Sequence, residues 1–303
     1  MKSVCFLAGI LLAAATTWSQ EPTFRVDVQL VRLLATVKDT SGKPISGLTK
    51  ADFTITDNGA KQEISLFERH TSQPLSIGVL VDISGSTAKE LKYEVDSVTR
   101  FTRALFKEGN PDDRASLYSF NWQVAQAVDY TRHSDRFERA LRKLKAEAGT
   151  SLYDAIYLSA QDIQEREGRH VLIIVTDGGD TGSTKTYQQA MEEAHKADAV
   201  LYAVLVMPIT NDAGRNIGGE NALTTMTQTT GGKTFAPTIH DLDAVFEEIL
   251  KDLRTQYLLG FYPKSVPLNS NRFHRLEVRV NDPNLRVITR TGYYGDFESA
   301  DRR

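Results

Sequence analysis

The sequence is almost free of cysteine. Its single cysteine, Cys5, lies in an N-terminal segment that we expect to be removed, so the mature chain would contain no disulfide bond. Disulfide bonds are common in small exported eukaryotic domains, and a chain without them is more typical of a bacterial periplasmic or secreted protein. The cysteine content therefore favours a bacterial envelope setting.

Long hydrophobic runs are lacking as well. The longest, Val4–Ala15, is too short for a confident membrane span, and no later segment of the mature chain could cross a bilayer. Lys2, this apolar run and the small residues Thr17 and Ser19 predict a secretory signal peptide over residues 1–20. We expect a secreted or periplasmic protein, with a retained N-terminal anchor as the alternative.

The chain carries little excess charge of either sign. It has 36 basic and 39 acidic residues and a formal net charge of −3, so nothing predicts a nucleic-acid partner. The one basic stretch, Arg132–Lys145, has Phe137, Leu141 and Leu144 at helical spacing. We interpret it as an amphipathic helix with a solvated basic face, capped by Ser134 and ending near Gly149.

Common catalytic motifs are missing too. The sequence has no phosphate-binding glycine loop, no Gly-x-Ser-x-Gly elbow and no His-Glu-x-x-His helix. An aspartate after a first strand also suits aspartyl-phosphate chemistry, but such phosphatases carry a second acid two residues on, where this chain has Ser84. The histidines show no metal-ligand spacing. We therefore predict that the protein is not an enzyme.

The chain is organised around Leu75–Ser86. Its apolar run predicts a strand buried on both faces, and a helical pattern follows it, with apolar residues at positions 91, 95, 98, 101 and 105. Asp82, Ser84 and Ser86 then lie on the strand-to-helix turn, where open α/β sheets bind ligands. Their oxygens suit Mg²⁺, although aspartate and serine are also ordinary turn and cap residues.

Alternating strand and helix patterns continue to residue 256 and predict a doubly wound, mostly parallel sheet. One strand, Val124–Tyr130, is expected at an edge, and Pro208–Asn221 is predicted to be a loop. The remaining elements predicted from the pattern are strands Ala115–Phe120, His170–Thr176 and Ala199–Met207, and helices ending at Ile163 or spanning Thr186–Ala197 and Asp241–Leu253.

Three separated motifs on this pattern resemble the von Willebrand factor A domain. They are Asp82-x-Ser84-x-Ser86, Thr150 in a Gly-Thr-Ser-Leu-Tyr-Asp-Ala turn, and Asp177 in Thr-Asp-Gly after a buried strand. The resemblance implies a metal-ion-dependent adhesion site in which these five residues hold one divalent ion, Mg²⁺ or alternatively Mn²⁺ or Ca²⁺. It also implies a protein partner that presents an aspartate or glutamate. Nothing indicates an oligomeric state.

The charges of this ligand set are consistent with such a role. Two carboxylates roughly neutralise Mg²⁺, and three neutral hydroxyls leave the ion able to accept a carboxylate from a partner. The alternatives are an envelope scaffold whose metal only braces loops and, less favoured, a hydrolase. Asp180 is interpreted as a loop acid near the site, with a role beside the metal ligands or as a ligand through water as the alternative. Asp154 is interpreted as an early-helix residue favoured by the helix dipole.

The two chain ends contain short alternating patterns typical of β-strands. Residues 21–72 include Phe24–Val37, as one long strand or two short ones, then Phe53–Thr56 and a return strand Ile64–Phe67 after the turn Asp57-Asn58-Gly59. Neither end has enough strands to bury its apolar face alone. We therefore predict that residues 257–303 complete one β-sandwich with residues 21–72, and that the α/β domain, residues 73–256, is inserted in it. The strands expected in the C-terminal part are Tyr257–Pro263, Phe273–Val280 and a return strand Leu285–Arg290.

The architecture also resembles a family of secreted bacterial proteins described as von Willebrand factor A-related and abundant in acidobacteria. The segments that carry this closer resemblance are Asp52–Gly59, the Gly231-Gly232 turn, Gln256–Pro263 and Thr291-Gly292-Tyr293. It implies little about function, because the ligands of that family are mostly undefined.

Overall fold

A six-stranded sheet forms the centre of the molecule. The computed structural model describes residues 30–69, 73–206, 216–264, 266 and 272–295. The sheet is mostly parallel with β7 at an edge, as the sequence predicts. Strand β7 is antiparallel to its neighbour β6, and the other pairings are parallel. In spatial order the strands are β10 (Lys233–Phe235), β9 (Val200–Leu205), β8 (Arg169–Thr176), β5 (Leu75–Asp82), β6 (Arg114–Phe120) and β7 (Val124–Thr131).

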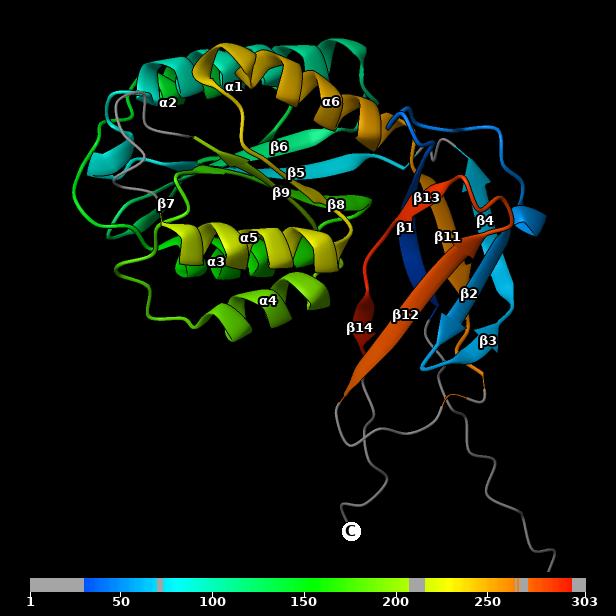
Figure 1. Ribbon diagram of the computed structural model, residues 1–303. Helices are drawn as coiled ribbons and strands as arrows, with labels where there is room; N and C mark the ends of the chain where they lie inside the picture. The colour runs from blue at the N-terminus through cyan, green and yellow to red at the C-terminus, as the bar shows by residue number, and fades with distance from the viewer. Residues whose placement is uncertain (1–29, 70–72, 207–215, 265, 267–271, 296–303) are drawn as a thin grey trace, which may run out of the picture.

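Helices cover both faces of this sheet (Figure 1). One face packs against α1 (Leu91–Glu108), α2 (Ser134–Leu141) and α6 (Leu242–Arg254). The other packs against α3 (Leu152–Gln164), α4 (Tyr187–Lys196) and α5 (Ile217–Thr230). Every residue of β5 and β8 is buried, which explains their near-continuous apolar runs. None of the helices in the described part of the chain is long and apolar enough to span a lipid bilayer.

Three local expectations for this domain were wrong. Helix α2 ends at Leu141 rather than near Gly149, and Ser134 is its first helical residue, with His133 at the cap position and no side-chain cap bond. Helix α5 begins at Ile217, inside the segment expected to be a loop, while residues 207–215 lie outside the described residues. The sequence pattern gave no sign of α5 because threonine and glycine make it weakly amphipathic.

The two chain ends form one β-sandwich, as predicted. Its first sheet has the order β13-β1-β11-β4 and its second β14-β12-β2-β3, so each sheet combines strands from both ends. Their inner faces share one apolar core that includes Leu33, Ile55 and Leu259. The strands are β1 (Val31–Lys38), β2 (Phe53–Asp57), β3 (Ala60–Gln62), β4 (Ile64–Arg69), β11 (Tyr257–Phe261), β12 (Phe273–Val280), β13 (Arg286–Ile288) and β14 (Gly292–Tyr294). Three 3₁₀ turns, η1 (Lys50–Asp52), η2 (Gly85–Thr87) and η4 (Ile239–Asp241), complete the elements named here.

Both predicted return strands pair differently from expectation. The hairpin at Asn58-Gly59, where both residues have positive φ, returns through the short strand β3, and β4 crosses to the opposite sheet. Likewise β13 pairs with β1, and β14 pairs with β12. In each case the segment predicted to pair with the strand before it instead pairs in the opposite sheet of the sandwich. The predicted strand residues 24–29 lie outside the described residues.

A buried aspartate holds the second sheet together. Asp57 is fully buried and accepts a hydrogen bond from the Tyr293 hydroxyl at 2.7 Å, and its carboxylate lies 3.0 Å from Nδ1 of His274. The three side chains come from β2, β14 and β12. One carboxylate therefore ties the N-terminal strand β2 to two C-terminal strands.

Asp57→Ala should destabilise the sandwich by roughly 3 kcal/mol, because each buried group that loses its acceptor costs about 1–3 kcal/mol. Amide hydrogen exchange in β2 and β12 would measure the opening free energy of this sheet. Glu277→Ala, an exposed acid on β12, is the matched control and should change stability by no more than about 0.5 kcal/mol. Equal effects of the two substitutions would contradict the role given to Asp57.

The chain enters and leaves the α/β domain at one place. There, Arg169 joins the segment that enters the domain to the segment that leaves it. Arg169 is largely buried at the start of β8, and its guanidinium donates to the backbone carbonyls of Gln73 on the incoming segment and Leu253 on the outgoing one. Burial lowers its pKa to about 10, so it still carries its charge at neutral pH. Lys38 of β1 adds an ion pair to Asp252 of α6 at 2.8 Å.

Candidate functional site

The carboxyl edge of the central sheet carries the candidate site, and Asp82 is its most buried member. Asp82 ends β5, Thr176 ends the neighbouring strand β8, and the parallel register places the two side by side. The Thr176 hydroxyl donates to Oδ2 of Asp82 at 2.6 Å, and the Ser84 amide donates to Oδ1 at 2.8 Å. The carboxylate is therefore fixed in orientation by two neutral donors.

The serines of the first motif lie on the turn that follows. Ser84 Oγ and Ser86 Oγ are 3.0 Å apart, so the two hydroxyls point to one spot. The Thr87 hydroxyl lies 3.1 Å from the carbonyls of Asp82 and Ser84, which keeps the turn closed. Exposure increases from the fully buried Asp82 through the buried Ser84 to the exposed Ser86. The candidate site is therefore exposed to solvent at Ser86.

Thr150 and Asp177 lie on two loops that are hydrogen-bonded to each other. The carbonyl of Thr150 accepts from the amides of Thr181 at 2.8 Å and Gly182 at 2.9 Å. Asp177 directly follows Thr176 and its Oδ1 accepts from the Gly179 amide at 2.9 Å. Because the Asp177 loop also follows β8, these bonds bring Thr150 to the edge that carries Asp82. The structure thus gathers all five predicted residues at one edge of the sheet.

The other two acids that the sequence singled out are structural. Oδ1 of Asp180 accepts from the amide of Leu152 at 2.9 Å and from the Ser183 hydroxyl, so Asp180 caps the start of α3. The carboxylate of Asp154 accepts from the Lys185 amide at 2.7 Å and from the Thr184 amide at 3.0 Å. Both acids hold the loops in place and are satisfied by protein donors.

Close backbone packing completes the edge. A Cβ on Gly219, in the first turn of α5, would lie 1.7 Å from the carbonyl oxygen of Gly178, so only glycine permits this approach. Trp122, on the β6–β7 turn, is 59% exposed and its backbone lies against Gly149, next to Thr150. The candidate site therefore has an exposed aromatic side chain on its rim.

The electrostatics of the site favour a cation. Burial raises the pKa of Asp82 to about 6, and the nearby Asp177 adds to the rise against the hydrogen bonds from Thr176 and Ser84. Two acids and three hydroxyls are a hard oxygen donor set of the kind that Mg²⁺, Mn²⁺ and Ca²⁺ accept. No group of three or more His, Cys, Asp or Glu side chains within the described ranges is arranged to hold a metal ion, so any such site here must rely on the hydroxyls. The residues present fit a divalent ion on these chemical grounds.

One acidic residue near the site was missed by sequence reasoning. Glu94, in the first turn of α1, is fully buried, and neither of its carboxylate oxygens has a hydrogen-bond partner in the described part of the chain. Burial raises its pKa well above the usual value, with Asp82, Glu90 and Asp177 adding to the rise. The signal that could have found it is its position one turn before Val98, on the apolar face of the helix.

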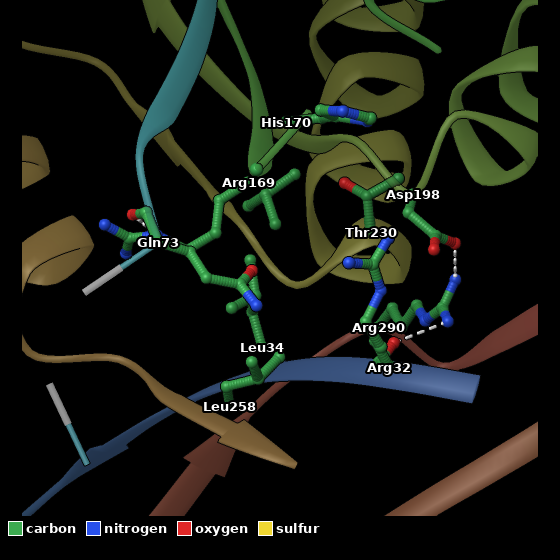
Figure 2. A pocket seen from close by; sticks show the side chains of 11 residues that line it. Arg32, Leu34, Gln73, Arg169, His170, Asp198, Thr230, Leu258 and Arg290 are labelled. Carbon is green, nitrogen blue, oxygen red and sulfur yellow. Dashed lines mark hydrogen bonds and ion pairs between the residues drawn. The ribbon is translucent and has the colours of Figure 1, made fainter. Parts of the chain in front are cut away.

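A cavity at the opposite end of the sheet does not belong to this site (Figure 2). It lies between the α/β domain and the sandwich, has a volume of about 40 Å³, and is lined by side chains that include Arg32, Gln73 and Arg290. Arg290 donates to the Asp198 carboxylate and, at 2.7 Å, to the carbonyl of Arg32. We interpret the cavity as part of the packing between the two domains.

Comparisons with known proteins show which family the central domain is similar to. A family model described as "von Willebrand factor type A domain" matches residues 76–251. The vWF domain of the type V pili tip protein Mfa5 from Porphyromonas gingivalis is similar in structure, with 14% identity and a TM-score of 0.50, over 60% of this chain and 95% of that chain. BatB from Bacteroides thetaiotaomicron has 16% identity and a TM-score of 0.46, over 60% of this chain and 100% of that chain.

These likenesses concern the fold. At such identities a similar structure does not carry over a ligand or a partner. The comparison with curated proteins gave no match. The closer resemblance to the secreted acidobacterial-type proteins is not tested by these comparisons and stays a prediction.

Proposed function

Because this chain belongs to the von Willebrand factor type A family, whose domains commonly mediate protein–protein interaction or adhesion, we propose that it is a metal-dependent binding module. In this proposal Asp82, Ser84, Ser86, Thr150 and Asp177 hold one divalent ion, Mg²⁺ or alternatively Mn²⁺ or Ca²⁺. The observation that carries the proposal is the convergence of these five residues on one sheet edge that opens to solvent at Ser86.

Each group has a separate task in the proposed site. Asp82, held by Thr176 and Ser84, presents a fixed carboxylate from the buried side, and Asp177 presents a second from the neighbouring loop. The three hydroxyls add neutral oxygens. The bound ion would supply a Lewis-acidic position for an aspartate or glutamate of the partner protein.

The surroundings of the site support protein binding. Trp122 beside the Thr150 loop is exposed, and tryptophan is among the residues that contribute most to binding energy in protein interfaces. The alternative, in which a metal only braces loops, is less well supported. The loops are already joined by the bonds of Thr150, Asp154 and Asp180, none of which needs an ion.

The proposal includes export to the periplasm or the cell exterior. It rests on the predicted signal peptide, residues 1–20, which lies outside the described residues, and on the absence of cysteine from the rest of the chain. We propose no enzymatic activity, because the site offers neither a nucleophile paired with a base nor one of the catalytic motifs named above.

Partner capture should depend on both the metal and the rim. The test uses a partner isolated from envelope extract in Mg²⁺ and then purified. EDTA should abolish its binding, and Trp122→Ala should weaken it by at least tenfold, as expected of a central interface tryptophan that costs about 2 kcal/mol or more. Surface plasmon resonance measures both effects.

The control for the rim is Tyr262→Ala, which removes an exposed aromatic side chain from the sandwich. It should leave affinity unchanged. Binding that survives EDTA, or a partner on which no single aspartate or glutamate matters when mutated, would show that the adhesion-type mechanism is wrong.

A further inference from the structure

Glu94 occupies a position that should be apolar. Residues 94, 98, 101 and 105 form one stripe along α1, and the three apolar members are at most 2% exposed against the sheet. Glu94 is 0% exposed at the N-terminal end of this stripe. Since α1 follows directly from the Asp82–Ser86 turn, that end of the helix lies at the carboxyl edge of the sheet. The geometry therefore directs Glu94 to the underside of the candidate site.

The carboxylate of Glu94 has no hydrogen-bond partner among the residues that the structure describes. Both of its oxygens are buried without a hydrogen bond, whereas buried carboxylates are normally paired or bound to a metal. The charged groups that act on it, Asp82, Glu90 and Asp177, are all acids. The folded protein would be more stable with an apolar residue here than with an unpartnered carboxyl. The presence of the carboxyl therefore indicates that it interacts with a ligand.

We propose that Glu94 is a positioning residue of the metal centre, which stabilises the bound divalent ion from its buried side through coordinated water. This inference rests on the proposed function and extends it. Direct coordination is not proposed, since Asp82, Asp177 and Glu94 do not form a three-acid group that could hold an ion by themselves. The first turn of α1 further favours a negative charge at this position through the helix dipole.

A third negative charge changes the balance between retention of the metal ion and attraction of an acidic partner. Two carboxylates neutralise a divalent ion. The charge of a bound ion would favour the ionised form of Glu94, which then adds a negative charge beyond neutrality on the side away from solvent. The loaded centre is then less positive toward an incoming carboxylate. Glu94 thus favours retention of the ion between binding events over attraction of an acidic partner.

The test is calorimetric titration of the mature full-length chain with Mn²⁺. Glu94→Gln keeps the shape of the side chain and removes its charge, and it should weaken Mn²⁺ binding by about 10- to 100-fold, as is usual for outer partners of a metal site. Glu193→Gln is the matched control. Glu193 is a largely buried glutamate on α4, across the sheet, and its loss should leave Mn²⁺ affinity unchanged.

A second measurement separates positioning from a purely structural role. In EDTA the Glu94→Gln chain should unfold at the same temperature as the wild type or higher, because the amide has the same shape and cannot carry a negative charge beside Asp82, Glu90 and Asp177. Wild-type Mn²⁺ affinity in Glu94→Gln, with or without a loss of thermal stability in EDTA, overturns the inference.

Asp82→Asn distinguishes this failure from failure of the proposed function. If Asp82→Asn loses Mn²⁺ while Glu94→Gln keeps it, only the role of Glu94 is wrong. If the wild type binds no Mn²⁺, or if Asp82→Asn binds as well as the wild type, the proposed site itself is wrong, and the inference about Glu94 is wrong with it.

Discussion

Asp82→Ala is expected to abolish binding of Mg²⁺ and Mn²⁺. The substitution removes one of two carboxylates and the group around which the Ser84 amide and the Thr176 hydroxyl are arranged. The loss should exceed the roughly 10- to 100-fold cost of removing an outer partner of a metal site. Isothermal titration calorimetry of the wild type and the variant measures it directly.

Folding should largely survive this substitution. Burial already disfavours the charged form of Asp82, whose pKa is raised to about 6, so its removal relieves a cost as well as breaking two hydrogen bonds. Asp154→Asn is a suitable control because Asp154 is bonded to the backbone at Thr184 and Lys185 in the same group of loops. Unchanged Mg²⁺ affinity in Asp82→Ala, or an equal loss in Asp154→Asn, would remove the basis for the assignment.

Deleting residues 257–303 is expected to unfold the sandwich completely. Strand β1 would lose both of its neighbours, β11 and β13, and β2 would lose β12. Only the β2–β3 hairpin would remain, and an isolated hairpin is at best marginally stable in water. Hydrogen exchange should therefore show no protection for residues 30–69, and the exposed strands should promote aggregation.

A single substitution tests the same dependence without a truncation. Leu259 of β11 is fully buried in the sandwich core, and Leu259→Arg would place a charge there that has no partner, which costs several kcal/mol. Protection of β1 and β2 should be lost together. Protected, cooperative exchange of residues 30–69 in either variant would mean that the N-terminal strands fold independently of the C-terminal ones.

The fold could be predicted largely because the burial of each strand determines the pattern of apolar residues along it. Strands β5 and β8 are buried on both faces and read as continuous apolar runs, while β12 alternates and reads as a half-buried strand. The alternation cannot say which strand lies beside which. For that reason the return strands β4 and β13 were assigned to the wrong partners, although their existence was predicted.

The part of the candidate site that could be predicted consists of the acidic side chains that directly follow strand ends. Asp82 and Asp177 follow neighbouring parallel strands, so the sheet itself brings them together. Glu94 was not found in this way because it lies on a helix and not at a strand end. Its position on the apolar face indicates burial, but the sequence does not show that its carboxylate is unpartnered. Helix α5 was missed because its threonines and glycines make it only weakly amphipathic, so its sequence shows no clear helical period.

The bonds of Arg169 to both the incoming and the outgoing segment of the α/β domain have a mechanical consequence. The domain that carries the candidate site is a closed loop of chain that leaves the sandwich and returns to it beside the point of departure. Tension between residue 30, before β1, and residue 295, after β14, is borne by the strand pairings of the sandwich. The inserted domain lies outside this line of force and keeps its shape until those pairings give way. The pairings of the sandwich are therefore expected to break before the domain that carries the candidate site is stretched.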